Sequence, residues 1–302
     1  MSEYFLTTEN LTKTYGKKTV VKNVNLHIKR GAIYGLIGRN GAGKTTIMKM
    51  ITGVAIPSDG VFRYEGLECS LKDAFEHVGA LIESPAVYYD ITAYDNLRIK
   101  ALAYGVDNSK ERIDELLAIV GLTDVNKKKV GKFSLGMKQR LGIAMALVAN
   151  PDFLVLDEPI NGLDPQGIVE IRELLIKLNK ENGITILISS HILEELSKFA
   201  TDYAIIEEGE IIEESTREEL NRKCTSRIII ESNELSRVAP VIEEIGIRNY
   251  SIINSNTLEI YERTDELSLV NTELVKAGIS IESILVKKQD LEEYFLEVIK
   301  KH

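Results

Sequence analysis

Nine consecutive residues constrain the fold of this chain more than any other segment. Residues 38–46 read Gly-Arg-Asn-Gly-Ala-Gly-Lys-Thr-Thr, directly after an apolar run at 33–37 and directly before a helix-like stretch. A strand, a glycine-rich loop ending in Gly-Lys-Thr and a helix, in that order, form the phosphate-binding loop (P-loop) of nucleotide-binding α/β proteins. A glycine-rich turn with a chance lysine is the alternative, and the flanking strand and helix argue against it. The sequence therefore predicts a P-loop NTPase of the α/β class.

This loop supplies most of the residues expected to bind a nucleoside triphosphate. Gly38, Gly41 and Gly43 are expected to adopt positive φ, which turns backbone N–H groups toward the phosphate oxygens. Lys44 is expected to reach the β- and γ-phosphates, and the hydroxyl of Thr45 to ligate Mg²⁺. The expected cofactors are thus ATP and Mg²⁺. The nucleotide contacts predicted from this loop are Gly38, Asn40, Gly41, Ala42, Gly43, Lys44, Thr45 and Thr46.

Apolar runs farther along the chain predict the sheet that carries the loop. Residues 153–156 and 184–188 are short runs, apolar except for Thr185, and they flank an amphipathic segment at 168–178. Two buried strands joined by a helix read as parallel neighbours in one sheet. Residues 3–37 carry further strand-like pieces, one of them at 20–28, and 94–148 is a largely helical tract.

Two carboxylates follow the apolar run at 153–156 and would lie at the carboxyl end of that strand. Asp157 is expected to help hold Mg²⁺, and Glu158 to orient or deprotonate the water that attacks the γ-phosphate. An Asp-Glu pair alone is usually a solvated strand end. Downstream of a phosphate loop, the catalytic interpretation is favoured.

Three further motifs complete a recognisable set. Residues 133–140 read Phe-Ser-Leu-Gly-Met-Lys-Gln-Arg, with Ser134 where a helix N-cap would stand; Asn-Gly-Leu-Asp follows at 161–164, and Ser-Ser-His at 189–191. With the phosphate loop and the carboxylate pair upstream, the chain resembles the nucleotide-binding subunits of ABC transporters over residues 1 to about 220. The resemblance implies an ABC ATPase core with a mixed β-sheet and a helical subdomain at about 84–150.

The resemblance also implies a homodimer with ATP held at the interface between two subunits. In such a dimer Ser134 and Gly136 contact the γ-phosphate bound by the partner, and Asp164 communicates between the two sites. His191 hydrogen-bonds the γ-phosphate and senses hydrolysis, and Tyr15 stacks on the adenine. The alternatives are an ordinary capped helix, a turn aspartate, a structural histidine and a half-buried strand tyrosine.

Two departures from the usual family pattern stand out. The signature has Phe133, Leu135 and Met137 where leucine, glycine and glutamine are usual, so its local packing differs. Glu83 replaces the loop glutamine that reaches Mg²⁺ and the attacking water. The carboxylate keeps an acceptor oxygen, loses the amide donor and adds negative charge. Glu83 is thus a candidate catalytic and metal-binding residue, with a surface glutamate as the alternative.

With these two departures, the chain resembles the bacitracin-export and lantibiotic-immunity branch of ABC ATPases. The branch implies ATP hydrolysis at the cytoplasmic face of the membrane, by a subunit attached peripherally to separate integral membrane permease subunits that expel peptide antibiotics. The alternative is a soluble ABC-type ATPase that acts on ribosomes or nucleic acid. A net charge of −9 and the lack of a second cassette argue against it, and no nucleic acid partner is expected.

The chain is expected to form two domains. Residues 1–220 would form the ATPase domain, and residues 222–302, with alternating strand-like and helix-like runs, a small C-terminal α+β domain without a catalytic constellation. No segment approaches the roughly 20 apolar residues of a membrane-spanning helix. Cys69 and Cys224 form no metal or redox motif, which is typical of a reducing compartment.

Overall fold

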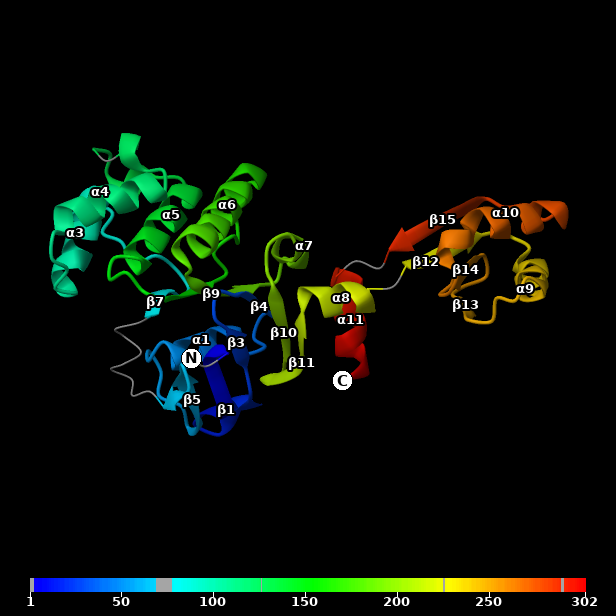
Figure 1. Ribbon diagram of the computed structural model, residues 1–302, viewed down its shortest axis with the longest axis horizontal. Helices are drawn as coiled ribbons and strands as arrows, with labels where there is room; N and C mark the ends of the chain where they lie inside the picture. The colour runs from blue at the N-terminus through cyan, green and yellow to red at the C-terminus, as the bar shows by residue number, and fades with distance from the viewer. Residues whose placement is uncertain (1–2, 69–77, 126, 225, 289–290) are drawn as a thin grey trace. The chain divides into compact units, whose positions relative to one another are not determined.

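A computed structural model describes residues 3–68, 78–125, 127–224, 226–288 and 291–302 of the chain (Figure 1). Cys69 lies outside the described residues. The chain divides into two compact units, Met1–Arg217 and Glu218–Lys301. Each unit has a hydrophobic core of its own.

An antiparallel sheet opens the first unit and is built around one long strand. β1 runs over Tyr4–Tyr15 and pairs with its neighbours β2, β3 and β5. The strand-like piece at 20–28 is in fact parts of two strands, because β2 ends at Val24 and β3 begins at His27. Within β2, Asn23 adopts a φ of +47° where the pairing with β1 is irregular. The other strands of this sheet are β2 (Lys18–Val24), β3 (His27–Lys29), β5 (Asp59–Tyr64) and β6 (Leu67–Glu68).

A second sheet carries the phosphate loop, with strands in the order β11-β10-β4-β9-β8-β7. Its neighbours are parallel except β10 and β11, which are antiparallel, so the predicted mixed sheet is confirmed. The two apolar runs after the helical tract are adjacent parallel strands, as expected. The strands are β4 (Ile33–Ile37), β7 (Val78–Leu81), β8 (Phe153–Asp157), β9 (Thr185–Ser190), β10 (Asp202–Glu207) and β11 (Glu210–Thr216).

Helix α1 (Lys44–Ile51) starts at the end of the phosphate loop and packs into the core between the two sheets. Its Ile47 and Met48 are fully buried beside residues from both sheets, among them Phe5 and Phe153, whose rings lie 5.4 Å apart. The phosphate loop therefore stands on a rigid base.

The helical tract forms a group of helices on one side of the second sheet (Figure 1). Close backbone approach fixes this group to the sheet: a Cβ on Gly79 of β7 would lie 2.3 Å from the carbonyl oxygen of Ala146. The helices and 3₁₀ turns here are α3 (Ala93–Ala103), α4 (Ser109–Ile119), η1 (Thr123–Val125), η2 (Val130–Lys132), α5 (Leu135–Ala146), α6 (Pro165–Asn182) and α7 (Leu193–Ser197).

The second unit is a small α+β fold with an antiparallel sheet in the order β13-β14-β12-β15. Alternate residues of β12 and β14 meet apolar residues of α9 and α10 in its core, including Ile228, Ile260 and Val270. Its elements are α8 (Arg217–Lys223), β12 (Ser226–Glu231), α9 (Leu235–Glu244), β13 (Tyr250–Ile252), β14 (Thr257–Ile260), η3 (Thr264–Glu266), α10 (Leu267–Lys276), β15 (Ser283–Lys288) and α11 (Leu291–Lys301).

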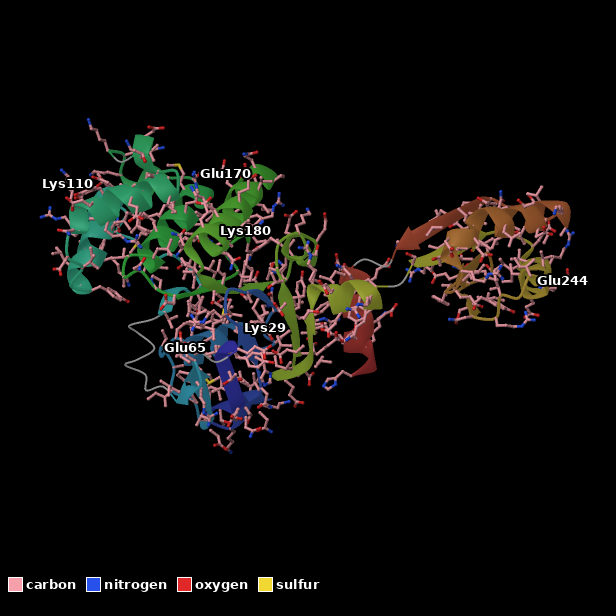
Figure 2. All side chains as sticks on the ribbon, in the orientation of Figure 1. Lys29, Glu65, Lys110, Glu170, Lys180 and Glu244 are labelled. Carbon is pink, nitrogen blue, oxygen red and sulfur yellow. The ribbon has the colours of Figure 1, made fainter. Side chains whose placement is uncertain are left out.

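Charged side chains of both signs lie at the periphery of each unit, as Lys110, Lys180 and Glu244 show in Figure 2. Within the described part of the chain, none of the helices combines the length and the apolar character needed to cross a bilayer.

Candidate nucleotide site

The phosphate loop has the backbone that its glycines were expected to give, with one correction. Gly41 and Gly43 adopt φ of +85° and +112°, and Gly43 is the N-cap of α1. Gly38, in contrast, does not have positive φ. It is needed for close packing instead, because a Cβ there would lie 2.5 Å from the carbonyl oxygen of Ile206 in β10.

The turn between β10 and β11 holds the loop from outside. Its Gly209 donates a backbone hydrogen bond to the carbonyl oxygen of Ala42 (2.9 Å) and accepts one from the N–H of Lys22 (2.8 Å). A Cβ on Gly209 would lie 2.5 Å from the carbonyl oxygen of Val20. The turn thus ties the phosphate loop to β2 through backbone hydrogen bonds.

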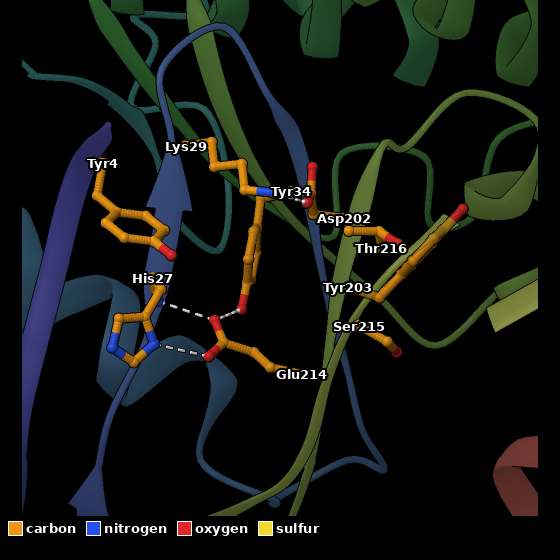
Figure 3. Close-up of a pocket in the computed structure, with 9 residues that line it drawn as sticks. All are labelled: Tyr4, His27, Lys29, Tyr34, Asp202, Tyr203, Glu214, Ser215 and Thr216. Atoms are coloured by element: carbon orange, nitrogen blue, oxygen red, sulfur yellow. Dashed lines mark hydrogen bonds and ion pairs between the residues drawn. The ribbon is translucent and has the colours of Figure 1, made fainter. Parts of the chain in front are cut away.

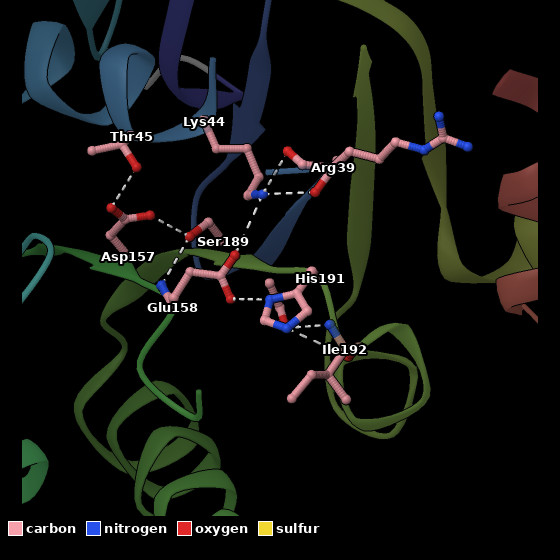
Figure 4. Close-up of polar contacts among 10 residues, drawn as sticks. Arg39, Lys44, Thr45, Asp157, Glu158, Ser189, His191 and Ile192 are labelled. Carbon is pink, nitrogen blue, oxygen red and sulfur yellow. Dashed lines mark hydrogen bonds and ion pairs between the residues drawn. The ribbon is translucent and has the colours of Figure 1, made fainter. Parts of the chain in front are cut away.

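Lys44 is buried and its ammonium group lies within the loop (Figure 4). The Nζ atom donates to the carbonyl oxygens of Gly38 (2.6 Å) and Arg39 (3.2 Å), and it lies 3.4 Å from Glu158 Oε1. A cation in this position can interact with the phosphates of a nucleotide.

Asp157 ends β8 and is almost fully buried, with both carboxylate oxygens hydrogen-bonded. Thr45 Oγ1 donates to Asp157 Oδ2 (2.7 Å), and Ser189 Oγ donates to Asp157 Oδ1 (2.6 Å) (Figure 4). Among the described residues, no three His, Cys, Asp or Glu side chains gather to hold a metal ion. One hydroxyl and one carboxylate nevertheless suit Mg²⁺, which usually takes few protein ligands beside substrate phosphates and water.

Glu158 follows directly and adopts a φ of +50°, which is unusual for a residue with a side chain. This conformation places its two carboxylate oxygens in different surroundings. Oε2 lies 2.8 Å from His191 Nδ1, whereas the buried Oε1 accepts no hydrogen bond from the described residues. A buried carboxylate oxygen without a hydrogen-bond donor can accept one from a water or a substrate group.

A cavity of about 220 Å³ lies over the loop. It brings Glu158 of β8 together with the phosphate loop, although more than a hundred residues separate them in sequence. The lining residues are Val20, Arg39, Asn40, Gly41, Gly43, Lys44, Thr45, Thr46 and Glu158.

Ser134 and Asp164 both cap helices. Ser134 Oγ accepts from the N–H of Met137 (3.3 Å) at the start of α5, and Asp164 Oδ1 accepts from the N–H of Gly167 (3.1 Å) at the start of α6. The predicted N-cap at Ser134 is confirmed. Neither residue, nor Gly136, is among the described residues that line the cavity over the loop, so one chain alone does not bring them to it.

Tyr15 ends β1 and is half exposed, with 52% of its surface accessible. The ammonium of Lys13 lies 4.9 Å from the centre of its ring and donates a hydrogen bond to the carbonyl oxygen of Ile56 (2.5 Å). The ring thus lies on the protein surface with a cation near it.

Glu83 adopts a φ of +65° at the centre of a tight turn in which the N–H of Ser84 donates to the carbonyl oxygen of Ile82 (2.9 Å). Its carboxylate accepts a hydrogen bond from Lys49 Nζ (2.6 Å), and this bond raises the pKa of Lys49. Lys49 lies one helical turn after Thr45 on α1. Glu83 is not among the described residues that line the cavity.

A second cavity, of about 210 Å³, lies near β3, β4 and β11 (Figure 3). Here Glu214 accepts hydrogen bonds from the hydroxyl of Tyr34 and from the backbone N–H of His27, and His27 Nδ1 lies 2.8 Å from its Oε2. Burial, and secondarily Glu214, raise the pKa of Tyr34 well above its usual value. These polar groups satisfy one another, so the cluster reads as structural.

The fold and the first site together define a P-loop ATPase: a glycine-rich loop at a helix N-terminus, a buried lysine, and two carboxylates at the end of a parallel strand of the same sheet. Comparison with known proteins narrows this class. The ABC transporter family matches residues 21–161. The chain is 42% identical over 300 residues to the bacitracin transport ATP-binding protein BcrA of Enterococcus faecalis, covering 98% of this chain and 97% of that protein. The chain therefore belongs to the ABC transporter family, as one of its ATP-hydrolysing, ATP-binding subunits.

Other relatives agree with this assignment. The lantibiotic transport ATP-binding protein SrtF of Streptococcus pyogenes is 49% identical over 204 residues, which are 68% of this chain and 87% of that protein. Among solved structures, cbiO1 of Clostridium perfringens, part of the ABC transporter complex cbiONQ, superimposes with a TM-score of 0.68 at 28% identity, covering 81% of this chain and 98% of that one. The ATP-binding cassette MJ0796, dimeric and bound to ADP and Pi, gives 0.64 at 25% identity, covering 70% and 98%.

Two residues of the site escaped the prediction from sequence. Ser189 bridges the two carboxylate residues, and Lys49 pairs with Glu83. A signal for Ser189 existed, since it is one of two serines that follow the apolar residues 186–188 in a buried strand. Lys49 gave no such signal, because a lysine on an amphipathic helix is ordinary.

Proposed function

We propose that this protein is the ATPase subunit of an exporter that expels a peptide antibiotic of the bacitracin or lantibiotic type through separate membrane subunits. The observation that carries the proposal is the similarity to BcrA of Enterococcus faecalis over nearly the whole of both chains. The solved structures that resemble this chain are ATPase subunits of ABC transporters, and this disfavours the alternative of a ribosome- or nucleic-acid-directed ATPase.

ATP is proposed to bind with its phosphates on the loop at 38–46 and its adenine on Tyr15. Thr45 and Asp157 are the residues that would hold Mg²⁺, and the ion would supply charge neutralisation between the β- and γ-phosphates. Glu83 stays a candidate at the edge of this site, held by Lys49.

Hydrolysis then requires Glu158 to accept a proton from the attacking water. Its Oε1 is buried, lacks a hydrogen-bond donor and lies 3.4 Å from Lys44, so it is aimed at the region of the phosphates. His191 holds Oε2 and fixes the orientation of the carboxylate. A base fixed in this way loses little entropy when it meets the water.

The N-terminus of α5 is proposed to complete the site of a second copy of the chain. Ser134 and Gly136 stand at that end, where free N–H groups favour an anion such as the γ-phosphate of the partner's ATP. Asp164 would lie at the seam between the two copies. A dimeric cassette among the similar structures supports this arrangement.

The membrane subunits are proposed to dock near Glu83 and the segment that follows it, residues 88–97. Tyr88 and Tyr89 expose 60% and 55% of their surface there, which is unusual for large aromatic side chains and is typical of interaction surfaces. Docking at this place would attach the protein peripherally to the cytoplasmic face of the membrane.

Co-purification tests this function. The tagged chain would be expressed in its own host, membranes solubilised in mild detergent, and the bound proteins identified in the presence of ATP. A polytopic membrane protein is the expected partner, and deletion of its gene should sensitise cells to a peptide antibiotic. Recovery of ribosomes or nucleic acid alone would overturn the export function while leaving the ATPase in place.

A further inference from the structure

Ser189 connects the two carboxylate residues of the nucleotide site. It stands opposite Asp157 in the parallel pair of β9 and β8, and its side chain is completely buried. Its hydroxyl donates to Asp157 Oδ1 at 2.6 Å and accepts from the backbone N–H of Glu158 at 2.9 Å. Figure 4 shows this hydroxyl between the two residues.

The connection needs a group that both donates and accepts a strong hydrogen bond. A serine or threonine oxygen carries one hydrogen to donate and lone pairs to accept, whereas alanine or valine offers neither. Placing a hydroxyl in a buried strand costs free energy unless it is hydrogen-bonded, and here both bonds are made to the residues at the carboxyl end of the adjacent strand.

We infer that Ser189 is a positioning residue for ATP hydrolysis, which acts through Asp157 and Glu158 rather than on the substrate. Its bond to Asp157 leaves Thr45 as the donor to the other carboxylate oxygen, so the carboxylate cannot rotate. Its bond to the N–H of Glu158 holds that residue at its unusual φ of +50°, which aims the side chain at Lys44. One hydroxyl thus fixes the metal-binding carboxylate and the base relative to each other.

The adjacent Ser190 supplies a matched control. It is also completely buried, but its hydroxyl bonds to the backbone of Ile192 (2.9 Å) and to neither carboxylate residue. Replacing either serine by alanine removes the same atom from the same strand. A merely structural effect should therefore be similar in Ser189→Ala and Ser190→Ala.

The test measures binding of ATP with Mg²⁺ and with EDTA, kcat and KM for hydrolysis, and urea unfolding, all on the full chain. In EDTA, Ser189→Ala should bind ATP as tightly as the parent. In Mg²⁺ its affinity for ATP should be about 10-fold lower than that of the parent. Its kcat should fall by about 10- to 100-fold with little change in KM. Ser189→Thr should restore both, because the hydroxyl remains. Ser190→Ala should leave both at the parent values.

If Ser189→Ala fails to fold, Ser189→Cys takes its place, since a thiol fills the space and hydrogen-bonds weakly; it should lower kcat in the same way. Equal kcat and equal Mg²⁺ response in the Ser189 and Ser190 variants would overturn the inference. It rests on the proposed roles of Asp157 and Glu158, so Asp157→Asn and Glu158→Gln are measured alongside. Parent activity in those two would refute the site assignment itself, whereas their loss with an unaffected Ser189→Ala would refute the role of Ser189 alone.

Discussion

At the scale of single residues, Glu158 concentrates the chemistry of the site. Its backbone conformation is unfavourable for a residue with a side chain by about 1 kcal/mol or more. Contacts from Ser189, His191 and Lys44 hold the residue in this conformation. Such a conformation is expected where the direction of a side chain matters more than local stability.

The substitution Glu158→Gln tests the role of this residue as a base. The amide keeps the size of the side chain but accepts no proton, so turnover should fall by about 10²- to 10⁴-fold while ATP still binds. Because the bound ATP is not hydrolysed, the dimer should then accumulate. Phosphate release and light scattering with ATP measure the two effects, and hydrolysis at the parent rate would contradict the assigned role.

Tyr203 gives a prediction for alkaline pH. Burial raises the pKa of Tyr203 to about 12, whereas an unfolded tyrosine ionises near about 10. Below about pH 10 the phenol is neutral in both states, and the full stabilisation is present. Between about pH 10 and about 12 only the unfolded chain ionises, so stability falls by up to about 2–3 kcal/mol from this group.

The measurement is the urea-unfolding free energy of the parent and of Tyr203→Phe from pH 8 to 11. The variant should start about 1 kcal/mol lower, because it loses the hydrogen bond from the hydroxyl to the carbonyl oxygen of Ala200 (3.1 Å). The gap should close as pH rises. Parallel curves would show that the Tyr203 hydroxyl is not responsible for the alkaline loss.

The sequence predicted those site residues whose type and spacing indicate their chemistry. Lys44, Thr45, Asp157 and Glu158 were found because their spacing follows a known loop and strand end, and the structure brings all four together. Gly38 was interpreted wrongly, because its need for close packing arises from Ile206, which is distant in sequence. The bridge made by Ser189 depends on the register between β8 and β9, which a sequence does not state.

At the scale of elements, α1 and the loop after β7 are joined by the pair of Lys49 and Glu83. The ion pair is partly exposed, so its contribution to stability is small, about 0–1 kcal/mol. Its position matters more than its strength, because Lys49 is on the helix that begins at Lys44, and Glu83 begins the segment proposed to meet the membrane subunits.

The prediction is that the two residues act together. Glu83→Gln should shift the Mg²⁺ dependence of ATP hydrolysis or of export, since it removes a negative charge beside the site, while ATP still binds. Lys49→Gln should shift the Mg²⁺ dependence in the opposite direction, because it leaves Glu83 without its cation. The double variant should behave like Glu83→Gln alone, because Lys49 has no carboxylate left to neutralise. Additive effects, or unchanged Mg²⁺ titrations and export in all three variants, would show that the pair does not influence the site.

Element boundaries followed from sequence where the pattern was strong. The helix after the phosphate loop and the strands at 153–157 and 185–190 were expected within a few residues of their observed ends. The break between β2 and β3 was missed because the apolar pattern continues across it. The positive φ of Asn23, which makes the β1–β2 pairing irregular, is likewise not reported by periodicity.

At the scale of the whole molecule, the two units have separate cores, and the nucleotide site belongs entirely to the first. The alignment with SrtF, 204 residues long, is close in length to that unit. A fragment of residues 1–217 is therefore expected to fold cooperatively and to bind ATP with the affinity of the full chain. Circular dichroism during urea unfolding and a fluorescent ATP analogue test this.

Loss of cooperative unfolding in the fragment would show that the second unit stabilises the first. Retained ATP binding with lost export in cells would instead assign the second unit a role in assembly or regulation. The sequence predicted a strand-and-helix mixture for this unit, but the purpose of the unit did not follow, because no group in it carries recognisable chemistry.

The turn between β10 and β11 has a practical consequence for anyone who wishes to follow this protein in cells. A hairpin tip is ordinarily a good place for a fluorophore or an inserted peptide tag. Here, however, Gly209 bonds to Ala42 and to Lys22, so an insertion would pull on the loop that receives the phosphates. Glu181 near the end of α6, whose side chain is 65% exposed, offers a safer attachment point for a reporter.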